Sequence, residues 1–238
     1  MAVVVGCCGF RRARSTYYHD FAVVELQRTF YKPPRIETVQ NWRQEAPSDF
    51  IFTLKAWQLI THEPSSPTYR KAGIRIDPDQ RGKYGSFRPT SQVWEAWNKT
   101  ESIAEAAGAT VVLFQCPASF RPIDENITNL REFFSSMGKR KFRCAWEPRG
   151  PWPEETIREL CRDLELIHCV DPLANSQLWG EVGYFRLHGL CGYGYRYTDR
   201  DLQRLRESIS SRKEGYLFFN NVSMYEDALR FKQLLREE

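Results

Sequence analysis

The chain of 238 residues has no apolar run near the roughly 18 residues that a membrane-spanning helix needs. Its opening residues, MAVVVGCCGF, form too short an apolar stretch for a secretory signal and have no positive charge ahead of it. We therefore expect a cytoplasmic protein with no membrane partner, whose first residues form a buried strand.

Paired cysteines with metal-finger spacing are also missing. The seven cysteines are an odd number, and Cys7 and Cys8 are adjacent, which makes it difficult for both to bind one metal ion. Cys116, Cys144 and Cys169 lie in apolar runs, which is typical of small buried hydrophobic residues. We expect reduced thiols, and the cysteines predict no metal or redox site.

Neither G-x-G-x-x-G nor G-x-x-x-x-G-K-[ST] follows the first apolar run, which argues against a nucleotide-binding fold. The chain also lacks internal repeats and low-complexity segments. Its net charge of +4 comes from 34 basic and 30 acidic residues that are interspersed. This balance permits anionic partners but does not require nucleic acid. The sequence contains no coiled-coil pattern, so it does not predict an oligomeric state.

Eight short apolar runs, by contrast, are spread along the whole chain. They are VVVGC at 3–7, FAVVEL at 21–26, FIFTLKA at 50–56, TVVLFQ at 110–115, KFRCAWE at 141–147, LIHCVD at 166–171, YFRLHG at 184–189 and GYLFFNN at 215–221. Runs this short and this apolar are typical of parallel strands that are buried on both faces.

Helical patterns lie between these runs, at Ile36–Glu45, Gln92–Ala107, Ile123–Met137, Glu154–Leu164, Asp199–Arg212 and Tyr225–Arg236. Thr198 with Asp201, and Ser223 with Glu226, predict capping boxes for the last two. Residues 10–20 leave room for a short helix, and residues 172–183 for a turn or two. The alternation predicts one domain, 1–238: an irregular TIM-type (β/α)₈ barrel with short first and sixth crossovers. The alternative is an open doubly wound sheet.

Nearly every strand changes from apolar to polar at its carboxyl end, where barrel enzymes place their chemistry. We expect a hydrogen-bonded ring of charged side chains there, because buried charges need partners. Its members are Glu25, Lys55, Glu147, Arg149, Asp171, Arg186 and His188. Gln27, Tyr31, His62, Gln115, Asn220 and Asn221 follow the same strands and are candidate substrate-binding residues.

Two segments beside this end are candidate binding loops. The long loop 63–92 carries six basic residues, among them Arg70, Lys71 and Arg75, against three acidic ones. A loop of this length is typical of a lid or a binding segment, and its charge favours an anionic ligand. The stretch GYGYRY at 192–197 includes Tyr197, whose ring is suited to stacking on a ligand or packing the rim.

Six ordered stretches resemble the YecE-like family, known as domain of unknown function 72: VELQRTFY, FTLKAWQLITH, LFQCPASF, AWEPR, FRLHG and FFNN. The resemblance runs from about residue 3 to about residue 230. It implies a TIM-type barrel and no established activity. The family's motif residues fall on the candidates named above other than Gln27, Tyr197 included, and also on Thr29, Phe30, Thr61, Pro117 and Gly189. The opening GCCGF and the pair Gln27–Arg28 depart from the family pattern.

Three functions are compatible with these residues. The first is an enzyme for a small anionic substrate, phosphate-bearing ones included. Glu147 or Glu25 would be its general base and His188 its acid–base partner. Lys55 would stabilise negative charge or form a Schiff base. In this hypothesis a carboxylate-rich half (Glu25, Glu147 and Asp171) faces a cationic half (Lys55, Arg149 and Arg186).

The second function is metal-dependent cleavage of a phosphoester in nucleic acid. A divalent metal ion would be bound by Glu25, Glu147, Asp171 and His188, although no H-x-x-E or H-x-H signature supports it. The third is a module without catalytic activity that binds an anion or a protein.

Overall fold

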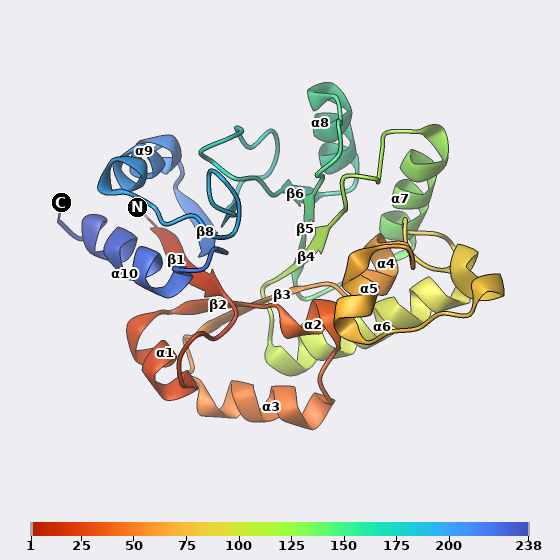
Figure 1. Cartoon of the computed structure of the whole chain (residues 1–238), viewed down its shortest axis with the longest axis horizontal. Helices are drawn as coiled ribbons and strands as arrows, with labels where there is room; N and C mark the ends of the chain where they lie inside the picture. Colours follow the sequence, from red (N-terminus) through yellow and green to blue (C-terminus); the bar gives the residue numbers. More distant parts are fainter. Residues whose placement is uncertain (1, 238) are drawn as a thin grey trace.

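Eight parallel strands form one sheet in the order β6-β5-β4-β3-β2-β1-β8-β7 in the computed structural model, which describes residues 2–237. They are β1 (Ala2–Cys8), β2 (Val23–Leu26), β3 (Ile51–Lys55), β4 (Val111–Gln115), β5 (Arg143–Glu147), β6 (Leu166–His168), β7 (Gly183–Leu187) and β8 (Glu214–Phe219). Figure 1 shows helices surrounding these strands on the outside. The predicted α/β barrel is confirmed, and the doubly wound alternative is wrong, because neighbouring strands follow chain order around the sheet.

The barrel is nearly closed between β6 and β7. No regular ladder joins these strands, and a single bridge pairs Val170 with Phe185. Val170 N donates to Tyr184 O at 3.3 Å, and Arg186 N donates to Val170 O at 2.9 Å. The strand predicted over 166–171 is regular only over Leu166–His168, although Cys169 N still donates to Trp146 O in β5 at 2.8 Å. On the side of β7, His168 N donates to Trp179 O in the following loop at 3.1 Å, so the pairing of β6 with β7 is incomplete.

The six predicted long helices are confirmed, with ends that differ by up to three residues. The helices are α1 (Arg14–Asp20), α2 (Arg28–Tyr31), α3 (Ile36–Glu45), α4 (Gln58–Thr61), α5 (Pro67–Ala72), α6 (Ser91–Ala107), α7 (Asp124–Ser136), α8 (Glu154–Asp163), α9 (Asp199–Ile209) and α10 (Met224–Leu234), with a 3-10 helix η1 (Pro78–Lys83). Within residues 2–237, no helix is long and apolar enough to cross a membrane.

One of the two predicted capping boxes is present. Thr198 accepts from Asp201 N, and the Asp201 carboxylate accepts from Thr198 N, at the start of α9. The box predicted for α10 is wrong, because the Ser223 side chain makes no capping hydrogen bond. Glu226 instead accepts from Arg12 at 3.1 Å, which commits its carboxylate to the neighbouring loop.

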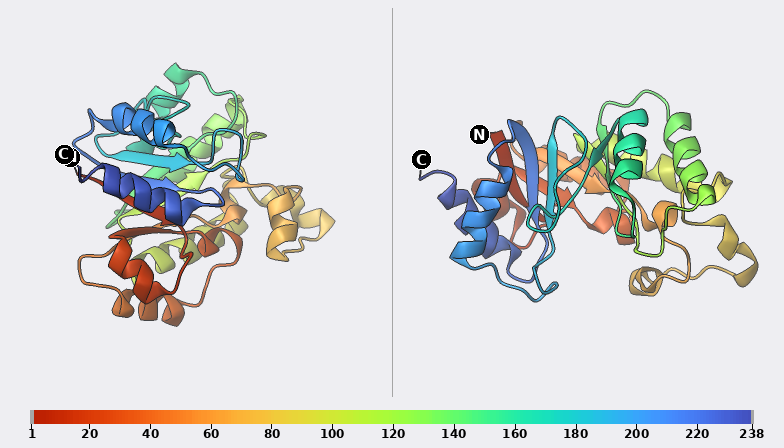
Figure 2. Two further views of the ribbon diagram at one scale, coloured as in Figure 1. Left: turned by 60° about the vertical axis from the view of Figure 1, so that its left-hand side comes forward. Right: turned by 90° about the horizontal axis from the view of Figure 1, so that it is seen from above.

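The long loop after β3 contains more structure than the sequence predicted. It holds α5 and η1, and Figure 2 shows this segment projecting from the body of the barrel. Its basic side chains at positions 70, 71, 75, 81 and 83 are all exposed. Two further short helices, α2 and α4, directly follow β2 and β3.

Two hydrophobic cores hold the fold together. The larger lies between the strands and the helices. The smaller fills the barrel interior and contains Cys8, Val23, Val111, Leu113, Ala145, Ile167, Cys169, Val182, Tyr184 and Phe218. These inward residues alternate along each strand, as β geometry requires. Gly6 belongs to the same inward series, and a Cβ there would lie 2.3 Å from Val23 O, so only glycine lets β1 and β2 approach this closely.

Candidate functional site at the carboxyl ends of the strands

Polar side chains form a layer directly above the apolar interior of the barrel. The inward alternation that places Val23, Leu113 and Ala145 in the core continues two residues later to Glu25, Gln115 and Glu147. The same alternation along the other strands directs five more polar side chains inward: Lys55, Asp171, Arg186, His188 and Asn220. This layer lies at the carboxyl ends of the strands, the end at which barrels place ligands.

Arg186 lies at the centre of the layer and is fully buried. One nitrogen of its guanidinium contacts Glu25 Oε1 at 3.0 Å, and another donates to Glu147 Oε2 at 2.6 Å. The second nitrogen also donates to Gln115 Oε1 at 2.9 Å. The predicted separation of a carboxylate half from a cationic half is therefore wrong, because the guanidinium lies between the two carboxylates and binds both.

Glu25 has little remaining capacity to accept hydrogen bonds. Besides Arg186, it accepts from Tyr184 OH at 2.7 Å, from Gln27 Nε2, and from Cys8 Sγ at 3.2 Å. Its exposure is zero. A carboxylate with this many donors holds Arg186 in place.

Glu147 is held by cationic and imidazole groups. Its Oε1 accepts from Arg149 Nε at 2.8 Å and lies 3.1 Å from His188 Nε2. Burial raises the pKa of Glu147, but Arg186, Arg149 and His188 outweigh burial and hold that pKa well below its usual range. Glu147 is therefore ionised at neutral pH.

His188 and Arg149 form the part of the layer that solvent reaches. Their side chains are 25% and 37% exposed. His188 Nδ1 lies 3.1 Å from the amide of Asn220, and the Arg149 guanidinium lies beside His188 Nε2. Burial lowers the pKa of His188, which favours the neutral imidazole.

Lys55 stands apart from the network that the sequence predicted it would join. It is 5% exposed, and within the described residues its amine makes no hydrogen bond or ion pair. Nζ instead lies 3.5 Å from the centroid of the Phe30 ring. Burial, and then the charge of Arg186, lower the pKa of this amine to about 7.

Three other candidates bind backbone groups beside the layer. Asp171 accepts from His188 N at 3.3 Å and from Leu173 N at 3.0 Å. Tyr197 OH accepts from Gly189 N at 2.7 Å, and Asn221 donates to Tyr195 O at 2.7 Å. The structure does not bring the side chains of Tyr197 and Asn221 into the network around Arg186. They hold the loop after β7 in place.

The remaining two candidates, His62 and Tyr31, flank Phe30. The Phe30 ring meets His62 edge-on at 5.0 Å and Tyr31 edge-on at 4.9 Å. Burial lowers the pKa of His62 to about 3, so its ring is neutral. The Tyr31 ring also lies under Lys71 of the projecting segment, with Nζ 4.9 Å from the ring centroid. Phe30 thus connects Lys55 to the base of that segment.

Three further residues belong to this end of the barrel and were not among the candidates. Tyr184 and Cys8 both donate to Glu25, and both are inward residues of their strands, which is the signal that could have identified them. Gln58, in α4, is fully buried, and its Oε1 has no hydrogen-bond partner among the described residues.

The arrangement does not fit a divalent metal ion. Among residues 2–237, no group of three or more His, Cys, Asp or Glu side chains converges as ligands. The Arg186 guanidinium lies between Glu25 and Glu147, where a metal ion bridging those carboxylates would have to lie.

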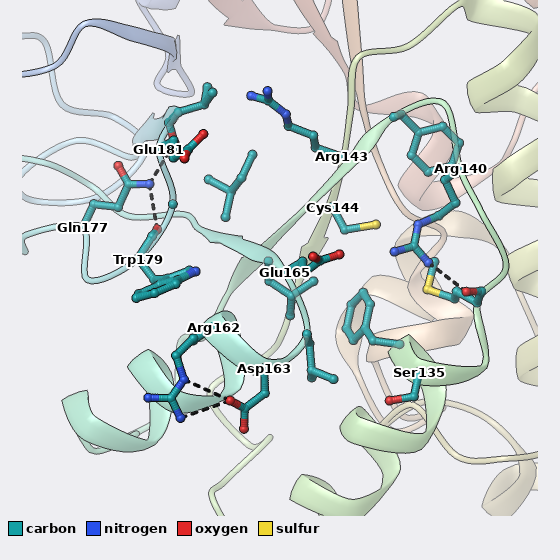
Figure 3. Close-up of a pocket in the computed structure, with 18 of the residues that line it drawn as sticks. Ser135, Arg140, Arg143, Cys144, Arg162, Asp163, Glu165, Gln177, Trp179 and Glu181 are labelled. Atoms are coloured by element: carbon teal, nitrogen blue, oxygen red, sulfur yellow. Dashed lines mark hydrogen bonds and ion pairs between the residues drawn. The ribbon is translucent and has the colours of Figure 1, made fainter.

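A groove of about 1430 Å³ lies at the opposite end of the barrel. Its lining includes Arg143 and Cys144 at the beginning of β5 and Glu165 before β6 (Figure 3). Arg162 and Asp163 form an ion pair at 3.1 Å on its rim. This groove shares no residue with the polar layer, and it lies at the amino ends of the strands.

Fold and site together define a nearly closed (β/α)₈ barrel with a buried, charge-neutralised polar layer at its carboxyl end. The chain belongs to the family described as protein of unknown function DUF72, whose model matches residues 9–238. It is 24% identical over 254 residues to the UPF0759 protein YunF of Bacillus subtilis, and the alignment covers 92% of this chain and 84% of YunF.

Solved structures agree with this assignment. A DUF72 family protein of Thermotoga maritima superimposes with a TM-score of 0.70 at 24% identity, covering 99% of this chain and 100% of the other. A DUF72 family protein of Enterococcus faecalis superimposes with a TM-score of 0.74 at 18% identity, covering 99% of this chain and 98% of the other. More distant proteins of the same fold include a D-psicose 3-epimerase, with a TM-score of 0.60 at 9% identity, and endonuclease IV of Thermus thermophilus, with 0.55 at 12%.

Proposed function

We propose that the protein is an enzyme that binds a small anionic substrate, including phosphate-bearing ones, at the polar layer. The supporting observation is the distribution of charge around Arg186. Arg186 and Arg149 together balance the charges of Glu25 and Glu147, and Lys55 adds a cationic group that no carboxylate binds. Arg149 shares Glu147 and still exposes 37% of its side chain.

Each residue has a distinct role in this proposal. Arg149 binds the anionic group, because a guanidinium offers paired donors to phosphate or carboxylate. The neutral groups of Gln115, His188 and Asn220 orient the remainder of the substrate. Lys55 transfers the proton, since its pKa of about 7 leaves both protonation states populated at neutral pH. Glu147 and Glu25 are poorly suited to the general-base role, because several donors already bind each of them.

The projecting segment supports the same substrate class. Arg70, Lys71, Arg75, Arg81 and Lys83 are exposed on it, and Lys71 contacts Tyr31 beside the layer. Exposed cations near a site raise the local concentration of anions. The fold neighbours whose names denote sugar epimerases share too little sequence to indicate a substrate, and they support the barrel alone.

Substitution of Arg149 tests this function. We expect Arg149→Met to weaken the binding of inorganic phosphate at least about tenfold, roughly 1.4 kcal/mol, because the exposed anion-binding donors are lost. Isothermal titration at fixed ionic strength measures the change. Arg131→Met is the matched control, since Arg131 is 42% exposed and pairs with one carboxylate, Asp163.

Equal phosphate affinity in the wild type and Arg149→Met would place the anion elsewhere and contradict the proposal. The two alternatives give different results. A binding module without catalytic activity would bind phosphate at Arg149 and turn over no anionic substrate. A metal-dependent phosphoesterase would cleave abasic DNA only with added divalent ions, and the bridging position of Arg186 argues against it.

A further inference from the structure

Lys55 reaches the polar layer from the last position of β3. Two residues earlier in the same inward series, Thr53 accepts from Tyr184 OH at 3.0 Å across the barrel. The Lys55 side chain therefore enters the layer from the wall of the barrel, and its pKa responds to the charges of Arg186, Glu147, Glu25 and Arg149. The amine thus lies within electrostatic range of the charged residues of the layer, Arg149 included.

The amine also lacks the partners that a structural lysine would have. A buried ammonium group is costly unless it is paired. Glu25 and Glu147 both form ion pairs with Arg186, and neither forms one with Lys55. Its one close contact is the face of Phe30. A lysine that serves only to balance charge would be expected to bind Glu25 or Glu147. This one is left with a free nitrogen.

We propose that Lys55 Nζ is a nucleophile that forms an imine with the carbonyl carbon of the substrate. This inference rests on the anion binding of the proposed function and gives Lys55 a covalent role in place of proton transfer. It narrows the substrate to a small aldehyde, ketone or 2-oxo acid that carries a carboxylate or phosphate. The anionic group would lie at Arg149, the solvent-exposed part of the layer, with the carbonyl directed inward. The low pKa of the amine keeps a fraction of it unprotonated at neutral pH, as nucleophilic attack requires.

The reaction balances without an oxidant or a reductant. The nitrogen lone pair forms a C–N bond as the carbonyl π bond breaks, and the oxygen takes up the proton that the nitrogen loses. The resulting carbinolamine then expels its hydroxyl as water, with a second proton from the nitrogen, to give a neutral imine. Protonation of that imine would make the adjacent carbon acidic, and hydrolysis regenerates the lysine.

Borohydride trapping tests the imine directly. The purified protein is incubated separately with pyruvate, with dihydroxyacetone phosphate and with uncharged dihydroxyacetone, then reduced with sodium borohydride and analysed by intact mass and peptide mapping. We expect one adduct, with the mass of an anionic probe less one oxygen atom, on the peptide that contains Lys55. Lys55→Met and Lys55→Arg should lose this adduct. Lys141→Met, at an exposed lysine, should keep it.

The outcomes separate this inference from the proposed function. Absence of an adduct with both anionic probes, or adducts spread over surface lysines in the wild type and Lys55→Met alike, overturns the imine. If phosphate still binds through Arg149 in that case, the proposed function stands. Labelling of Lys55 by uncharged dihydroxyacetone as efficiently as by its phosphate supports the imine and contradicts the anionic substrate.

Discussion

Replacement of Arg186 with methionine is expected to cost about 3–5 kcal/mol of folding free energy, the typical loss when one partner of a buried ion pair is removed. The reason is the number of groups that depend on one guanidinium. Glu25 and Glu147 have exposures of 0% and 5%, and both are bound to Arg186 at 3.0 Å or less. Without it, two carboxylates remain buried with too few cationic partners. This loss is a large share of the 5–15 kcal/mol that typically stabilises a folded protein.

Urea denaturation at neutral pH measures this effect. Arg131→Met, which removes an exposed ion pair with Asp163, should change the free energy of unfolding by less than about 1 kcal/mol. Arg186→Lys should recover little, because one ammonium group cannot donate in parallel to both carboxylates. A loss from Arg186→Met no greater than that from Arg131→Met would contradict the central role of this residue.

If Arg186→Met does not fold, a compensated variant keeps the prediction testable. In Arg186→Met combined with Glu25→Gln and Glu147→Gln, no buried charge of this trio remains. Replacing a buried ionic group by neutral residues of similar volume is often tolerated. We therefore expect the triple variant to be more stable than Arg186→Met alone. The opposite order would mean that lost packing, and not unpaired charge, causes the damage.

The positions of the polar residues could be predicted from the sequence because strand side chains alternate. Arg186 and His188 lie on the inner side of β7 and the loop that follows it. The same alternation places Glu25 on the inner face of β2 and Glu147 on the inner face of β5. The barrel follows from the same information, since eight buried runs separated by helical patterns have few other arrangements. The family resemblance agrees with both and is confirmed by the family model.

The pairing within the layer could not be predicted, because it depends on distances across the barrel. Sequence patterns do not show that Arg186 reaches both Glu25 and Glu147, and so they do not show that Lys55 is left without a carboxylate. The incomplete pairing of β6 with β7 could not be predicted for a similar reason: Trp179, eleven residues away, supplies the acceptor for His168 N. Contacts between distant segments decide both features, whereas periodicity reports only local geometry.

The unpaired state of Lys55 should also be visible in how stability depends on pH. Its pKa is about 7 in the folded protein, against an ordinary value of 10.5. Between these two values the unfolded chain carries a proton that the folded protein has released, so this residue makes folding more favourable as pH rises. Below about pH 7 the folded protein bears the full cost of a buried ammonium group with no carboxylate partner. Methionine has a similar length and carries no charge, so Lys55→Met should be more stable than the wild type there.

The difference in stability between Lys55→Met and the wild type is the quantity to measure, because it cancels the titration of every other group. Buried thiols such as Cys7 and Cys116 have raised pKa values and act in the opposite direction above about pH 9 in both proteins. From urea denaturation at successive pH values, we expect the advantage of Lys55→Met to shrink by at most about 1.4 kcal/mol per pH unit between about 7 and 10.5. Lys141→Met should show no such trend. A constant difference up to about pH 10 would mean that the Lys55 amine titrates as in the unfolded chain, and the buried, unpaired lysine on which the imine depends would then be wrong.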